Sequence, residues 1–155
     1  SHDEGGALAA RGRVDDAVLA AMLDKPWFDV KPPKSLDRHD FSLDAVRGLS
    51  VADGAATLTA FTAATVARAF RHLPEAPARL LVTGGGRHNA TLMAMLRDRL
   101  GVEVLPVESA GWCGDLMEAE AFAYLAVRSI EGLPLSWPGT TGVPAPQTGG
   151  RLNQP

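Results

Sequence analysis

Three consecutive glycines, Gly84-Gly85-Gly86, occupy the position in this sequence that is best suited to binding a ligand. They follow an apolar run at 79–83 and precede a helical pattern that begins at Asn89. A backbone without side chains can approach a phosphate or a ribose closely, and the N–H groups at the start of a helix attract anions. From the residues alone, a nucleotide-contacting turn and a simple tight turn both remain open.

Two well-known glycine loops can be compared with this turn. A P-loop requires a lysine followed by serine or threonine after its second glycine, whereas Arg87 follows Gly86 here, so a P-loop is excluded. The dinucleotide-binding fingerprint requires a third glycine where Asn89 stands, although Glu103 or Glu108 could imitate its ribose-binding acid. An NAD-binding domain therefore stays open as an alternative.

Carboxylates and a lone cysteine form a second group of candidates. Asp115 follows the glycine-rich loop at 111–114, where we expect it to cap a helix, because carboxylates are stabilised at helix N-termini. Glu118 lies within the first turn of that helix, where the roles of base, sugar ligand and cap are all open. Cys113 has no histidine near it in sequence, so we expect an inert thiol.

The basic and imidazole side chains give weaker signals. We expect Lys34, Arg38 and Arg87 to be solvated surface charges, although phosphate-binding sites use such cations. The four histidines show no paired spacing, so no metal site is expected in this chain.

The composition is that of a soluble globular domain. The 155 residues are 46% hydrophobic and 21% charged, and the net charge is −3 with the basic residues scattered, which argues against nucleic-acid or membrane partners. The apolar runs are shorter than the roughly 18 residues of a membrane span. One cysteine fits a reducing compartment, so a cytoplasmic location is expected. Because the chain begins without methionine, a piece of a longer protein is one option.

The periodicity predicts the elements that position these residues. We expect helices at 14–24, over roughly 20 residues after an N-cap at Asp53, at 89–100 and at 115–130, with strands at 79–83 and 102–107. A strand, helix and strand in this order form a right-handed crossover, so the two strands should be parallel. Residues 133–155, rich in proline and glycine, are expected to form an extended tail. The predicted fold class is α/β, in a single domain.

Three blocks of sequence carry a family resemblance. Together they resemble the anhydro-N-acetylmuramic acid kinase family: Pro32-Pro33-Lys34-Ser35-Leu36-Asp37-Arg38 with Phe41, then Val82-Thr83-Gly84-Gly85-Gly86-Arg87-His88-Asn89 with Thr91-Leu92-Met93, then Gly114-Asp115 with Glu118-Ala119 and Ala121-Phe122-Ala123.

The resemblance implies one lobe of the actin, hexokinase and Hsp70-like kinase fold, which is a ribonuclease H-like fold. By that likeness, residues 1–155 form the C-terminal nucleotide-binding lobe. Gly84, Gly85 and Gly86 would lie beside the adenosine and phosphates of ATP, and Asn89 would begin the helix behind them. Glu118 would face the cleft near the sugar.

The family opens the 1,6-anhydro ring of anhydro-N-acetylmuramic acid by hydrolysis and transfers the ATP γ-phosphate to O6, which forms N-acetylmuramic acid 6-phosphate for cell-wall recycling. Mg²⁺ would neutralise phosphate charge. The family's N-terminal phosphate loop and its catalytic aspartate, in an Asp-Thr-Gly-Pro-Gly-Asn motif, have no counterpart here. We therefore expect a fragment that is inactive without its N-terminal lobe. A non-catalytic nucleotide-binding or interaction module and a homodimer remain open.

Overall fold

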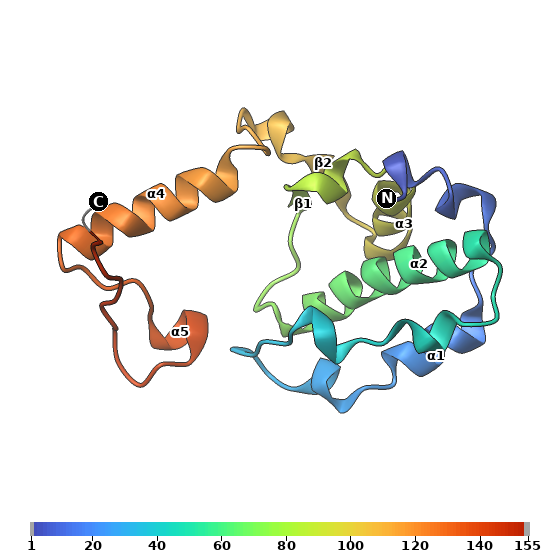
Figure 1. The fold of residues 1–155 in the computed structure, drawn as a ribbon, viewed down its shortest axis with the longest axis horizontal. Helices are drawn as coiled ribbons and strands as arrows, with labels where there is room; N and C mark the ends of the chain where they lie inside the picture. Colours follow the sequence, from blue (N-terminus) through green and yellow to red (C-terminus); the bar gives the residue numbers. More distant parts are fainter. Residues whose placement is uncertain (1, 154–155) are drawn as a thin grey trace.

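The structure, a computed structural model, describes residues 2–153 as a set of helices packed around a small sheet (Figure 1). Short 3-10 turns connect the main elements. The helices and strands are α1 (Asp16–Leu23), α2 (Val51–Ala69), β1 (Arg79–Val82), α3 (Ala90–Leu100), β2 (Glu103–Pro106), α4 (Met117–Ile130) and α5 (Pro138–Thr141). The predicted α/β class is confirmed.

Helix α2 runs through the centre of the main body and contacts both α1 and α3. Its 19 residues confirm the predicted length, but the predicted N-cap is wrong. Ser50 caps the helix by accepting a hydrogen bond from the Asp53 backbone N–H at 3.1 Å. The Asp53 carboxylate instead accepts the backbone N–H of Arg13 at 2.7 Å, which lowers the pKa of Asp53. The helix therefore begins at Val51, directly after Ser50.

Small residues of α2 let neighbouring elements approach it on two sides, because fully buried alanines leave room for larger partners. Two clusters of buried residues result. One contains Leu19, Phe28, Ala60, Phe61 and Ala64, and the other contains Ala63, Met93, Leu96 and Val104. The second cluster joins α2 to α3 and β2, and so fixes the sheet on the helical layer.

Strands β1 and β2 are parallel, with Leu80 opposite Val104, so the predicted parallel pairing is confirmed. The connecting helix α3 begins at the predicted cap, because the Asn89 side chain accepts the Leu92 N–H at 2.8 Å. It ends at Gly101, as expected from the sequence. Since parallel strands end at the same edge of a sheet, the glycine turn after β1 and the segment after β2 meet there.

Helix α4 and the segment after it extend away from the main body (Figure 1). The helix begins at Met117 rather than at Asp115, and none of its residues is buried. Residues 133–153 return along α4, held by the hydrogen bond from Arg128 Nε to the Pro134 carbonyl at 2.7 Å and by an antiparallel bridge between Ser136 and Gln147. The short helix α5 within this segment was not predicted. Within residues 2–153, no helix is both long enough and apolar enough to cross a membrane.

Leu96→Ala should lower the free energy of unfolding by about 2–5 kcal/mol, because it removes buried methyl groups and leaves a cavity in the α2–α3–β2 cluster. Leu43→Ala is the matched control, since Leu43 is 66% exposed and its loss should change stability by less than about 0.5 kcal/mol. Urea denaturation followed by far-ultraviolet circular dichroism measures both. Equal effects of the two substitutions would contradict the packing described above.

Candidate functional site

A pocket of about 480 Å³ lies where the ends of the two strands meet the start of α4. Its lining residues are Thr83, Gly84, Gly85, Gly114, Asp115, Met117 and Glu118. Three of the residues predicted for the site, Gly84, Gly85 and Glu118, are therefore brought together. The pocket has a backbone wall from the glycine turn and a carboxylate wall from α4.

The glycine turn is open toward space that a ligand can enter. Gly84 has φ +70° and ψ −176°, a backbone conformation that side chains disfavour. A Cβ atom placed on Gly84 or on Gly85 would meet no other atom within 4 Å. The backbone conformation at Gly84 thus favours glycine, and a ligand can approach the backbone of both residues.

The other two predicted residues lie outside the pocket lining. A Cβ atom on Gly86 would lie 3.5 Å from the Leu92 side chain, so this glycine faces α3. The Asn89 amide oxygen is used to cap α3, behind the turn. Both residues shape the turn and the helix that follows it.

Arg87 is buried, with only 3% of its side chain exposed, and the expectation of a solvated surface charge is wrong. Its Nε donates to Glu108 at 2.8 Å, its Nη1 donates to the Gly84 carbonyl at 2.9 Å, and its Nη2 lies 2.7 Å from Asp115. Hydrogen bonds to Asp115 and then to Glu108 raise the pKa of Arg87, against the opposing effect of burial. One guanidinium group therefore joins three segments of the site.

Asp115 pairs with Arg87, so the expectation that it caps α4 is also wrong. Leu116 occupies the N-cap position without a side-chain hydrogen bond. The hydrogen bond from Arg87 and the guanidinium charge hold the pKa of Asp115 below its usual value. His88 lies 3.9 Å from the same carboxylate and is 66% exposed. The Asp115 carboxylate is thus fixed at the rim of the pocket.

Glu108 and Gly114 complete the contacts around Arg87. The pKa of Glu108 is lowered by a hydrogen bond from its own backbone N–H and by the bond from Arg87. One oxygen of the Glu108 carboxylate is therefore engaged by Arg87 and by the Gly114 backbone N–H, at 2.8 and 3.2 Å. A Cβ atom on Gly114 would lie 2.6 Å from Arg87 Nε and 2.9 Å from the Glu108 carboxylate, so only glycine fits there.

Sequence reasoning missed the structural roles of Arg87, Glu108 and Gly114. A signal for the first two existed, since Arg87 follows β1 closely and Glu108 follows β2, and parallel strands bring such residues to one edge. Cys113 is free and exposed. Within residues 2–153, no group of three or more histidine, cysteine, aspartate or glutamate side chains is arranged to hold a metal ion.

The α/β architecture, with helices packed on a small parallel sheet, agrees with the single kinase-like lobe predicted from the sequence. A family model for "Anhydro-N-acetylmuramic acid kinase" matches residues 1–154, and this chain belongs to that family.

Curated relatives named anhydro-N-acetylmuramic acid kinase support the same membership. The relative from Rhizorhabdus wittichii is 62% identical over 154 residues, which are 99% of this chain and 42% of the relative. The relative from Caulobacter vibrioides is 61% identical over 97% of this chain and 40% of its own length. The relative from Jannaschia sp., named as kinase 1, is 59% identical over 99% of this chain and 41% of its own length. The chain therefore spans about 40% of the relatives it matches.

The side chain of Asp115 should titrate below its ordinary pKa of 3.8, because the paired form is stabilised by Arg87. Since the pKa is depressed in the folded state, the contribution of this pair to stability is complete above pH 3.8 and is lost as the pH falls through the depressed value. A carbon-13 NMR titration of the carboxyl group measures it. In Arg87→Met the pKa should return toward 3.8, whereas in Arg99→Met, at an exposed position, it should stay low. An unchanged value in Arg87→Met would contradict the pairing.

Proposed function

We propose that this chain is the C-terminal, nucleotide-binding lobe of an ATP-dependent kinase that acts on 1,6-anhydro-N-acetylmuramic acid and forms N-acetylmuramic acid 6-phosphate. The observation that carries the proposal is the pocket in which Gly84 and Gly85 face Glu118. It occurs in a chain that matches the anhydro-N-acetylmuramic acid kinase family along nearly its whole length.

The residues of the pocket suit complementary tasks. The backbone at Gly84 and Gly85, which no side chain covers, would contact the adenosine and phosphates of ATP. The Glu118 carboxylate can accept hydrogen bonds from sugar hydroxyl groups. Arg87 is a positioning residue, because it holds the carbonyl of Gly84 and the carboxylate of Asp115 in fixed places.

ATP supplies the phosphoryl group, and Mg²⁺ neutralises the charge of its phosphates. The backbone at Gly84 and Gly85 is open to the close approach of a phosphate or ribose, because a Cβ atom there would meet nothing within 4 Å. The pocket offers a metal ion few ligands of its own. Asp115 is already paired with Arg87, and the described residues 2–153 contain no cluster of metal-ligating side chains. We therefore assign Mg²⁺ to the ATP phosphates rather than to a site built by this lobe.

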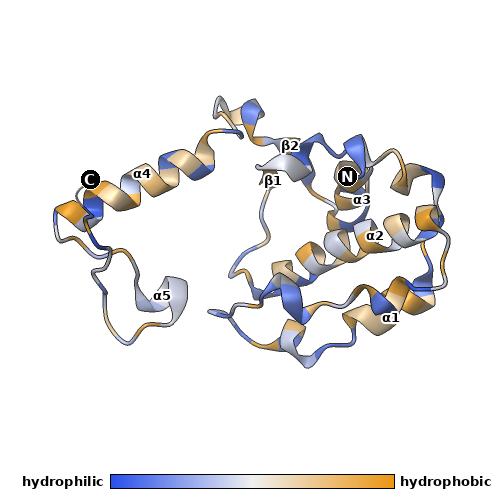
Figure 2. Cartoon of the chain, viewed as in Figure 1, coloured by the Kyte–Doolittle hydropathy of each residue, from blue (hydrophilic) through white to orange (hydrophobic). Residues whose placement is uncertain are grey.

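Helix α4 supports the existence of a further lobe that packs against this chain. Apolar residues occur around much of its circumference, and a helix of this kind is typically buried on several sides (Figure 2). Yet Phe122, Val127 and Ile130 are exposed by 65%, 58% and 68%. Together with the coverage of about 40% of each relative, this favours burial of α4 by the family's N-terminal lobe.

The catalytic carboxylate expected for the family would come from that N-terminal lobe. Without it, this chain can neither activate the nucleophile nor hold both ends of the phosphate chain, since positioning and charge stabilisation supply most of the rate in phosphoryl transfer. We therefore propose that the isolated chain has no kinase turnover, and that the complete enzyme works in the cytoplasm.

The isolated chain should show no phosphorylation of anhydro-N-acetylmuramic acid, while a chimera should be active. In the chimera, this chain replaces the 154 matching residues of the Rhizorhabdus wittichii relative. Coupled measurement of ADP release and detection of N-acetylmuramic acid 6-phosphate by mass spectrometry test both. A folded chimera that binds ATP but forms no product would favour the non-catalytic module instead.

Within the chimera, Glu118→Gln should lower kcat/KM for the sugar on the order of tenfold to a hundredfold, because a charge-assisted hydrogen bond is lost. Glu120→Gln is the matched control, since Glu120 lies in the same turn of α4 but does not line the pocket. Similar losses in both variants would show that Glu118 has no special role.

Gly85→Val in the same chimera should raise the KM for ATP, because the side chain would occupy the space that the nucleotide needs. The position tolerates a Cβ atom without a clash, so the variant should fold. Gly139→Val is the control, because a Cβ atom at Gly139 also meets nothing within 4 Å and the residue lies outside the pocket. An ATP affinity that does not change in folded Gly85→Val would contradict the assignment of the turn.

A further inference from the structure

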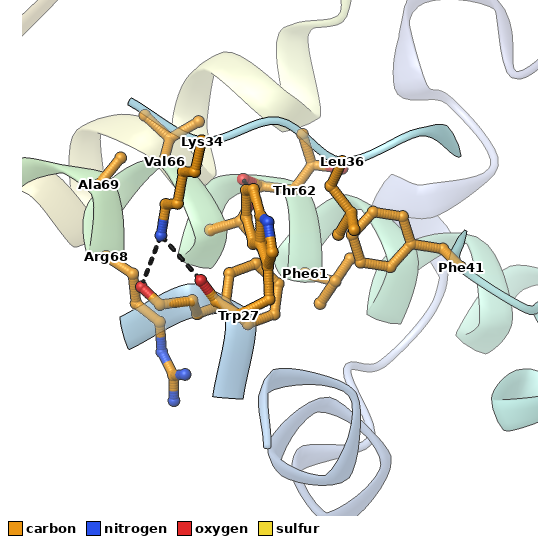
Figure 3. A pocket seen from close by; sticks show the side chains of 11 residues that line it. Trp27, Lys34, Leu36, Phe41, Phe61, Thr62, Val66, Arg68 and Ala69 are labelled. Carbon is orange, nitrogen blue, oxygen red and sulfur yellow. Dashed lines mark hydrogen bonds between the residues drawn. The ribbon is translucent and has the colours of Figure 1, made fainter. Parts of the chain in front are cut away.

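A second pocket, of about 570 Å³, lies on the other side of the main body, between α2, the 3-10 turn at Pro26–Asp29 and the loop that follows it (Figure 3). Its size is within the roughly 300–1,000 Å³ of small-molecule sites. Of the residues that line it, none lines the glycine-turn pocket. Its lining includes Lys34 of the Pro32-Pro33-Lys34-Ser35 block, to which the proposed kinase function gives no task.

Aromatic rings that are packed against one another form the apolar part of this pocket. Phe61 meets Phe28 and Phe41 edge to face, with ring centres 6.0 and 5.4 Å apart. Trp27 meets Phe28 in the same way at 5.4 Å, and its indole N–H donates to the Ser35 carbonyl at 3.0 Å. Because each ring is already fixed by a neighbour, the walls are formed before any ligand binds.

Two cations lie at one end of the pocket. Lys34 Nζ donates to the carbonyls of Trp27 and Phe28, each at 2.9 Å, and lies 4.3 Å from the centre of the Trp27 ring. Arg68 Nη1 donates to the Leu23 carbonyl at 2.6 Å. Figure 3 shows Lys34 toward one end of the pocket and Leu36 with Phe41 toward the other, with the Arg68 guanidinium group pointing away from Lys34.

The charges of Lys34 and Arg68 are not neutralised by the described residues. Neither side chain is in an ion pair within residues 2–153, and no carboxylate lines the pocket. Each cation keeps N–H donors beyond those used for backbone carbonyls, because an ammonium has three and a guanidinium has five. Apolar walls around uncompensated positive charge concentrate the field, which favours an anion. Tethering of the loop explains the hydrogen bonds of Lys34 but not the open apolar cavity beside them.

We infer that this pocket is a second binding site, separate from the glycine-turn cleft, for a small organic anion with a flat apolar body. The body lies against Trp27, Phe41 and Phe61, and the anionic group lies beside Lys34, with the charge of Arg68 at the same end of the pocket. Thr62, Thr65 and Ala69 of α2 form the floor. The charged end selects a ligand with negative charge, and the rings at the other end select a flat apolar body.

The test is a titration of the 155-residue chain with 1-naphthoate and with its neutral analogue 1-naphthalenemethanol, followed by proton–nitrogen NMR. The chain has three tryptophans, so the indole signal of Trp27 can be assigned with Trp27→Phe. We expect the Trp27 signal to shift while those of Trp112 and Trp137 do not. Naphthoate should bind on the order of tenfold more tightly than the alcohol, because only the anion gains charge-assisted hydrogen bonds.

Two pairs of variants locate the site. Thr62→Phe fills the pocket and leaves both cations in place, and it should fold because Thr62 is exposed and its hydroxyl bonds only to Leu58 of the same helix. It should abolish the shift, whereas Val51→Phe, at an exposed position outside the pocket, should not. Lys34→Met should remove most of the preference for naphthoate, whereas Lys31→Met in the same loop should keep it.

Three results would overturn the inference. Equal affinity for naphthoate and the alcohol would remove the role of charge, and a shift that survives in folded Thr62→Phe would place the ligand elsewhere. Displacement of naphthoate by ATP with Mg²⁺ would make this pocket the nucleotide site rather than a second one. The glycine-turn proposal can fail separately, because its test reads the KM for ATP in the chimera.

Discussion

The buried charge of Arg87 is the constraint on which the rim of the glycine-turn pocket depends. A guanidinium group that is 3% exposed is unfavourable unless its donors are matched by acceptors. The acceptors come from the glycine turn, from the segment after β2 and from the residue two before α4. Each segment must therefore hold its place around the same cation, and Gly114 is required where the backbone passes close to it. The position of Glu118 follows, because α4 begins just after this contact.

The sequence predicted the parts of the fold whose signals are local. Asn89 caps the start of α3 and Gly101 ends it, and both do so through neighbours a few residues away. A short stretch of sequence is therefore enough to predict the bounds of this helix. Asp53 shows where this fails. It is a good cap by type, but Arg13, which is 40 positions away, binds its carboxylate, and Ser50 becomes the cap. Arg87 fails for the same reason, because its partners lie on other elements.

Helix α4 shows a different limit of sequence reasoning. Its sequence pattern predicts a helix, as the structure has it. Apolar residues occur around much of its circumference, and such a helix is typically buried. Among the described residues, the returning tail packs against only part of it. Phe122, Leu125 and Ile130 line a groove with the returning tail near Leu152, yet Phe122 and Ile130 remain largely exposed. The N-terminal lobe proposed above would cover this exposed face.

Helix α2 explains why the aromatic pocket is open while the nearby core is closed. Ala60 and Ala64 face the aromatic cluster and Ala63 faces α3, and larger side chains of neighbouring elements fill the room beside them. Thr62 and Ala69 lie on a third side of the same helix, where spacings of three and four residues form one face. Thr62, Thr65 and Ala69 supply only short side chains to the pocket that α2 forms with the loop of Lys34 and Leu36. Leucines at positions 62 and 69 would close the cavity with the chain's own atoms. The residues that are present instead leave a preformed apolar space beside two cations, and such a space favours occupation by a molecule from outside the lobe.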